Sequence, residues 1–218
     1  MSPSLCRLLQ LASPALPVGA YTYSQGLEWA VEAGTVKDEA TALTWIADQL
    51  EWNLGRFEAP LLAQMMNAQK VGADGTAIEL DARYLASRES AELRAETLQM
   101  GHSLRKLIAD LSLPVAVPPT PTFPTVWSAL VAHWDIEPAE ALTAWLWSWA
   151  ENQALAALKA VPLGQAAGQR ILLEIGRRIP ALVDRALALD ESEFSNFAPG
   201  FAIACARHET QYSRLFRS

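Results

Sequence analysis

The sequence predicts an all-α protein: a single-domain bundle of roughly eight to ten helices, with a proline-rich internal loop and a C-terminal tail. Apolar residues recur at spacings of three and four through most of the chain, whereas the alternation typical of strands is almost absent. Ala and Leu are abundant and Val and Ile are sparser, which favours helices. A chain of 218 residues can bury one substantial core, so we expect residues 1–218 to form one domain.

A helix is expected to start at Ser24, after a loop, and the next one after residue 37. Asp38 is a good N-cap for a helix whose apolar positions run through Leu43–Leu54. A further helix is expected over Phe57–Gln69, entered through Pro60. The turn-forming stretch Gly72–Gly75 should end it.

The stretch Arg88–Leu111 carries the clearest amphipathic pattern in the chain. Its apolar residues predict one buried face, and its charged residues, from Arg88 to Glu96, are expected on a solvated face. The following stretch, Leu113–Pro124, contains five prolines, so it is expected to be a rigid loop without helix.

Two helices are expected after this loop, over Thr125–Trp134 and Pro138–Ala160. Pro138 suits the first turn of the second one. This helix contains three tryptophans at a spacing of two residues, Trp145, Trp147 and Trp149. Their side chains therefore lie on different faces of the helix and not along one stripe. A helix that is apolar on all sides is buried on all sides, so this one is expected at the centre of the bundle.

The last quarter of the chain is expected to hold two further helices. A break at Val161–Gly168 precedes a helix over Gln169–Leu189, which Pro180 should kink or split. Asp190–Asn196 reads as a turn or a short helix, and the final helix passes through Phe201.

Composition excludes several classes of partner and location. The net charge of −7 argues against nucleic acid, because phosphate binding draws on clustered Lys and Arg. The most apolar segment, Ala141–Ala150, is too short to span a bilayer, which needs about 20 residues. The N-terminus lacks a secretory signal, and Cys6 and Cys205 form no short-spaced motif. We therefore expect a cytoplasmic protein that contacts no membrane.

No catalytic, metal or cofactor motif is found. His102, His133 and His208 are far apart in the sequence and lack a partner at metal-ligand spacing, although a site assembled across the fold or across a dimer stays open. The stretch Gly164–Arg170 lacks the phosphate-loop pattern, and no strand precedes it. We therefore expect no enzyme activity, no metal and no cofactor.

Two segments suit a recognition surface better than simple packing. The first, within Leu8–Trp29, combines prolines, glycines and tyrosines, although a loop packed on the bundle explains it as well. The second, Arg207–Ser218, is basic at the end of an acidic chain. Tyr212, Leu215 and Phe216 would form one face of a short helix that orders on a partner, and a frayed terminus is the alternative.

These segments resemble the UreF family of urease accessory proteins. The matching strings are Leu8–Gly19, Tyr23–Gly34, Arg88–Arg94, Lys159–Gln165 and Ala206–Phe216. The resemblance implies an all-α homodimer that binds UreD, also called UreH, and recruits the GTPase UreG. The assembly delivers nickel to apo-urease, and the UreF-like protein is an adaptor without a reaction of its own.

The resemblance also assigns partner-binding positions, with residues 206–218 as the binding tail. These positions are Tyr23, Ser24, Gln25 and Glu28; Lys159, Pro162, Gly164 and Gln165; and Arg207, His208, Glu209, Thr210, Gln211, Tyr212, Ser213 and Arg214. Three alternatives stay open. One is a GTPase-activating role in which Arg207 or Arg214 stabilises transition-state charge; the others are a nickel-conducting chaperone and a helical enzyme for a small substrate.

Overall fold

A computed structural model describes residues 3–218, and within this range the chain forms helices and no strands. The α-helices are α1 (Pro3–Ala12), α2 (Leu27–Glu32), α3 (Glu39–Gln49), α4 (Ala59–Val71), α5 (Asp74–Ala86), α6 (Ala91–Asp110), α7 (Phe123–His133), α8 (Pro138–Ala160), α9 (Gln165–Ala188) and α10 (Pro199–His208). A π-helix, η2 (Leu50–Glu58), and two short 3₁₀ helices, η1 (Ala20–Thr22) and η3 (Glu191–Glu193), complete the set. The all-α fold class is confirmed.

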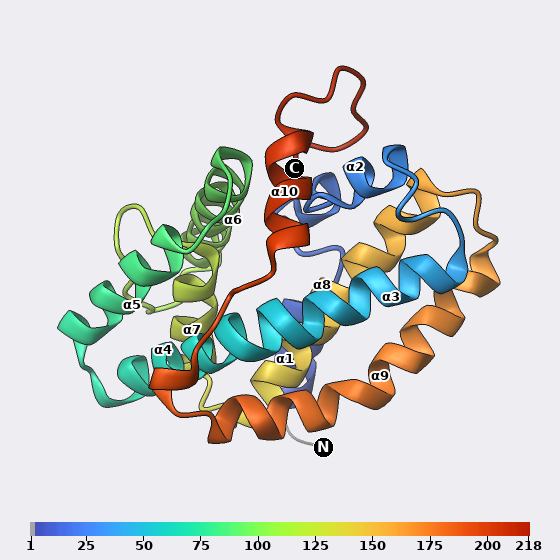
Figure 1. Cartoon of the computed structure of the whole chain (residues 1–218). Coiled ribbons are helices and arrows are strands. Elements are labelled where there is room, and N and C mark those ends of the chain that lie inside the picture. The colour runs from blue at the N-terminus through green and yellow to red at the C-terminus, as the bar shows by residue number, and fades with distance from the viewer. Residues whose placement is uncertain (1–2) are drawn as a thin grey trace.

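Helix α8 is the centre of the bundle, as its sequence predicts. It packs against α9 along its length and also against α1, α2, α3 and α4. In Figure 1, α4, α5, α6 and α7 gather on one side, α2, α3, α8 and α9 on the other, and α10 stands between them. Burial on all sides is wrong in detail: Trp145 is buried, but Trp147 and Trp149 are half-buried.

The sequence predicts two separate helices with a break before Phe57. The structure has no break there, because the π-helix η2 connects α3 and α4 into one continuous helix. The N-cap at Asp38 is confirmed. Its carboxylate accepts the Thr41 N–H at 2.9 Å, and the Thr41 hydroxyl oxygen accepts the Asp38 N–H, which completes a capping box. Pro60 lies in the first turn of α4, where the wider turns of the preceding π-helix accommodate a residue without an N–H.

Helix α5 was not expected from the sequence, which predicts a turn at Gly72–Gly75. Only Gly72 is a turn residue: its φ of +68° caps α4 in the left-handed region, and α5 begins at Asp74. Within α5, only Leu80 and Tyr84 are buried, so its apolar stripe is too thin to produce a clear periodic signal.

The proline-rich loop is confirmed, but it spans residues 111–122, two residues earlier than expected. α6 begins at Ala91 with Ser90 as N-cap, and α7 begins at Phe123 with Pro124 in its first turn. The loop lies against α6 at Gly101, where a Cβ would come within 2.2 Å of the Pro121 carbonyl oxygen. A side chain at this position would push the loop away.

The α8–α9 pair has the predicted bounds for α8 and different ones for α9. α9 begins at Gln165, so the expected break shortens to four residues, 161–164. The helix also continues through Pro180 instead of splitting there. Ile179 and Leu182 on either side of the proline are buried, and this packing outweighs the loss of one backbone hydrogen bond.

Candidate interaction site

The chain after α10, which we call the C-terminal segment (Glu209–Ser218), folds back onto the bundle. Figure 1 shows it as the loop above α10 that returns toward α2. It contains no helix, so the predicted helical face is wrong: Tyr212 and Leu215 are exposed, whereas Phe216 is buried. The reason is that the backbone N–H groups of Leu215 and Phe216 donate to a side chain of α2.

That side chain is Glu28, which lies at the centre of the site. One of its carboxylate oxygens accepts the Leu215 N–H at 2.6 Å, and the other accepts the Phe216 N–H at 3.0 Å. The Nε2 atom of His208 lies 3.3 Å from the second oxygen. A single buried carboxylate therefore ties α2 to α10 and to the C-terminal segment.

His208, which is fully buried, connects α2 to α6. Its Nδ1 atom lies 2.7 Å from Glu92, and its Nε2 atom faces Glu28. The ring therefore lies between two carboxylates, each of which also accepts a hydrogen bond from the C-terminal segment. Arg214 donates to the other oxygen of Glu92 at 2.5 Å, so that carboxylate holds α10 and the C-terminal segment together.

The turn Tyr23–Gly26 lies beneath the end of the C-terminal segment and binds it. The backbone N–H groups of Ser24 and Gln25 and the Ser24 hydroxyl all donate to the Ser218 main-chain oxygen, at 2.7, 3.0 and 2.5 Å. Gly26 has a φ of +77°, and a Cβ there would lie 3.1 Å from Cys205 of α10. The glycine therefore allows both the sharp turn and the close approach of α10.

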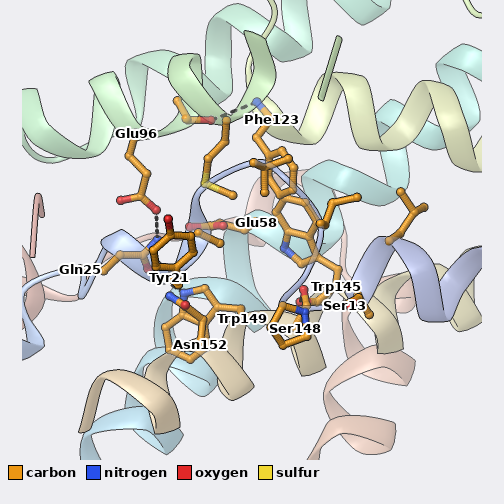
Figure 2. Close-up of a pocket in the computed structure, with 18 of the residues that line it drawn as sticks. Ser13, Tyr21, Gln25, Glu58, Glu96, Phe123, Trp145, Ser148, Trp149 and Asn152 are labelled. Atoms are coloured by element: carbon orange, nitrogen blue, oxygen red, sulfur yellow. Dashed lines mark hydrogen bonds between the residues drawn. The ribbon is translucent and has the colours of Figure 1, made fainter. Parts of the chain in front are cut away.

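The same turn reaches the buried carboxyl group of Glu96 on α6. Gln25 donates to Glu96 at 2.6 Å, as Figure 2 shows, and the Ser218 hydroxyl donates at 2.8 Å. Burial raises the pKa of Glu96 to about 7, and these two hydrogen bonds only partly oppose the rise. On the other side, the Trp149 indole N–H donates to the side-chain Oε1 of Gln25 at 2.6 Å, which links the turn to α8.

The structure brings together most of the positions predicted for partner binding. Tyr23–Glu28 and Arg207–Arg214 are adjacent across this network, and His208 is buried within it. The Lys159 ammonium lies 5.6 Å from the ring centroid of Phe216, so the end of α8 joins the site. Pro162, Gly164 and Gln165 lie apart: they are exposed on the α8–α9 connection, and no hydrogen bond among the described residues ties them to the network.

Sequence reasoning missed Glu92 and Glu96, which were assigned to a solvated face of α6. Glu96 and Arg88 are in fact buried. Their i,i+4 spacing with neighbouring charges resembles an ordinary surface pattern. Residues distant in sequence cover them: Glu58 contacts Arg88, whereas Gln25 and Ser218 contact Glu96. Glu209 adds to this packing, because its carboxylate accepts the Ala91 N–H at the start of α6 at 2.6 Å.

A second buried polar group lies beside the first. Arg88 donates to Glu58 at 2.7 Å, and the Tyr84 hydroxyl lies 3.3 Å from the same carboxylate. Burial raises the pKa of the Tyr84 hydroxyl well above its usual range. These residues, with Glu96, line one end of a pocket of about 930 Å³, a volume that includes its open mouth.

Two kinds of feature are absent from the described residues, 3–218. No group of three or more His, Cys, Asp or Glu side chains is arranged to hold a metal ion. No helix in this part of the chain is both long enough and apolar enough to cross a membrane.

Comparison with known proteins identifies the family. Residues 36–176 match the UreF family model. Three proteins named "Urease accessory protein UreF" are similar over nearly their whole length: from Azoarcus sp. (59% identical, covering 98% of this chain and 95% of that protein), from Dechloromonas aromatica (61%, 98% and 97%) and from Methylobacillus flagellatus (50%, 100% and 99%). This chain belongs to the UreF family of urease accessory proteins.

Proposed function

We propose that the protein is a non-catalytic, cytoplasmic adaptor in urease maturation. In this proposal it dimerises, binds UreD (UreH), and recruits and modulates the GTPase UreG so that nickel enters apo-urease. Membership of a family of urease accessory proteins supports the role in maturation. The adaptor role rests on the surface formed by α2, α10 and the C-terminal segment. Buried polar contacts hold the inner side of this surface, and its outer side is exposed to solvent.

The inner side of this surface is held by Glu28, Glu92 and His208 through short polar contacts. The outer side presents Tyr212, which is completely exposed, and Leu215, whose exposed fraction is 72%. Aromatic and arginine side chains are the groups that dominate binding energy at protein interfaces. The arrangement therefore suits recognition of another protein.

The test is co-purification of the full-length chain with UreD and UreG. Removing Arg207–Ser218 should abolish the ternary complex, but it also removes His208 and the buried Phe216. Tyr212→Ala and Arg207→Ala are sharper variants, because both side chains are exposed. We expect each to weaken the complex about tenfold or more, with an unchanged thermal unfolding curve.

The matched control is Leu173→Ala, an exposed apolar residue on the outer face of α9, which should leave complex formation unchanged. Normal complex formation by both Tyr212→Ala and Arg207→Ala would contradict the role given to this surface.

A GTPase-activating role is the second candidate, and the exposed guanidinium of Arg207 favours it over Arg214, which is paired with Glu92. Single-turnover GTP hydrolysis by UreG in the same complexes separates the two roles. A large loss of rate in Arg207→Ala with intact binding would identify an activating arginine. Parallel losses of binding and rate support the adaptor.

A further inference from the structure

The pocket beside the interaction site lies between α6 and α8, and the loop between α1 and η1, residues 13–19, also lines it. Figure 2 shows Glu96 and Phe123 on one side, with Trp149 and Asn152 opposite them. The space within it that is free of atoms is about 930 Å³, a figure that includes open solvent at the mouth, so the enclosed part is narrow and suits one slender side chain. Figure 2 also places Tyr21 among the lining side chains, and this tyrosine is 59% exposed.

Aromatic rings make up much of the pocket wall. Tyr21, Phe123, Trp145 and Trp149 all line it, and the rings of Phe123 and Trp145 stack with centroids 5.2 Å apart. The faces of such rings attract cations, most strongly where water is excluded. The ring of Tyr21 already has one such contact, because the Lys159 ammonium lies 5.9 Å from its centroid.

The charges that line the pocket do not balance. Glu58 and Arg88 neutralise each other in a buried ion pair. Glu96 accepts hydrogen bonds only from Gln25 and Ser218, both neutral side chains, and forms no ion pair among the described residues. A buried carboxylate without a cationic partner is costly, and a cation that enters the pocket and keeps its hydrogen bonds would offset part of that cost.

We propose that this pocket binds the ammonium or guanidinium group of a lysine or arginine side chain presented by a partner polypeptide. Glu96 provides the negative charge, and Tyr21 and Trp149 provide the ring faces. The apolar stem of the side chain packs against Leu16 and Met100, which also line the pocket. The cation site is argued from the pocket itself. Only the statement that a partner protein supplies the basic side chain rests on the proposed function.

A long basic side chain fits better than a small free amine. Its charge must reach a carboxyl group that is 6% exposed, and its methylene groups would cover apolar wall on the way. The position is also continuous with the interaction site, since Gln25 both lines the pocket and contacts the Ser218 main-chain oxygen. An anion is disfavoured, because the only cation in the lining, Arg88, is already paired.

Binding should be coupled to a proton. Burial raises the pKa of Glu96 to about 7, so a bound cation releases a proton from this carboxyl group below neutral pH. Affinity is therefore expected to increase from pH 6 to pH 8. The ionisable groups that interact with Glu96 come from the surrounding elements: Tyr23, Glu58, Tyr84, Arg88 and Cys205.

The test is a titration of the full-length chain, followed through the indole N–H resonances of Trp145 and Trp149. The probes are N-acetyl-lysine-N-methylamide and N-acetyl-arginine-N-methylamide, with the neutral N-acetyl-norleucine-N-methylamide as their isostere. We expect both basic probes to shift these resonances and the neutral probe to bind about tenfold more weakly or worse.

Two variants complete the test. Glu96→Gln should weaken the basic probes about tenfold and abolish the pH dependence, whereas Glu89→Gln, a neighbouring carboxyl group outside the pocket lining, should not. Leu155→Trp changes a lining residue that is 37% exposed, so it should block the pocket without disturbing the core.

Equal binding of the neutral isostere, or full binding by both Glu96→Gln and Leu155→Trp, would overturn the cation site. Tighter binding of n-butylamine than of the lysine amide would overturn the polypeptide source. The titration uses this chain alone, so its failure leaves the co-purification result unaffected, and a failed co-purification leaves the titration unaffected.

Discussion

Helix α8 and the C-terminal segment are held to the same bundle by different forces. α8 contacts α1, α2, α3, α4 and α9, and its buried positions are mostly Ala, Leu and Trp. The C-terminal segment buries one large apolar side chain, Phe216, and otherwise depends on Glu28, Glu92 and Glu96. Apolar packing is spread over many contacts, whereas these carboxylates are few, so the segment can detach while the bundle stays folded.

The largest effect is expected for Leu146→Ala, which tests the apolar side of this comparison. Leu146 is fully buried on α8, and the substitution leaves a cavity at the centre of the bundle. The free energy of unfolding should fall by about 2–5 kcal/mol, measured by urea denaturation. Leu155→Ala on the same helix is the control, and because Leu155 is 37% exposed its cost should be much smaller. Similar losses in both variants would contradict the central position of α8.

The next effect concerns the pH dependence of stability at Glu96. Below pH 4.5 the carboxyl group is protonated in both states; from there to about pH 7 the unfolded chain loses the proton while the folded chain keeps it. Stability therefore decreases as pH rises through this window, by about 3 kcal/mol in total.

Glu96→Gln removes this titration. The variant should gain stability over the natural sequence at pH 8 and little at pH 4, measured by denaturation at both pH values. Glu174→Gln on the exposed face of α9, where Arg178 lowers the pKa of the carboxyl group, should show no such gain at high pH. A gain for Glu96→Gln that is equal at both pH values would exclude the buried charge as its cause.

The smallest global effect is expected for Glu28→Gln, which tests the polar side of the comparison. The amide keeps one acceptor oxygen, so it cannot accept from Leu215, Phe216 and His208 together. Hydrogen exchange should show lost protection of the Leu215 and Phe216 amides, with a global cost of only about 1–2 kcal/mol.

The control for this variant is Glu32→Gln, which affects a single exposed contact to Gln211 and should leave both amides protected. Cooperative unfolding of the whole bundle in Glu28→Gln would show that the segment is part of the core and not a separable element.

Several elements were predictable because their signals are local. Asp38 as an N-cap, the bounds of α8 at Pro138–Ala160 and the helix-free proline-rich loop all depend on residues close in sequence. The errors occurred where distant contacts decide. α5 buries only Leu80 and Tyr84, and Pro180 does not break α9, because buried neighbours hold that helix in place.

The sequence by itself determined the all-α class, most of the helices and, through strings at both ends of the chain, the family. It also predicted Tyr23–Glu28 and Arg207–Arg214 as partner-binding segments. Only the tertiary structure decided that these segments meet, with His208 between Glu28 and Glu92, and that Glu96 is a buried carboxyl group beside a pocket. Helix formation is a local property, whereas burial of a charge depends on which distant segment covers it.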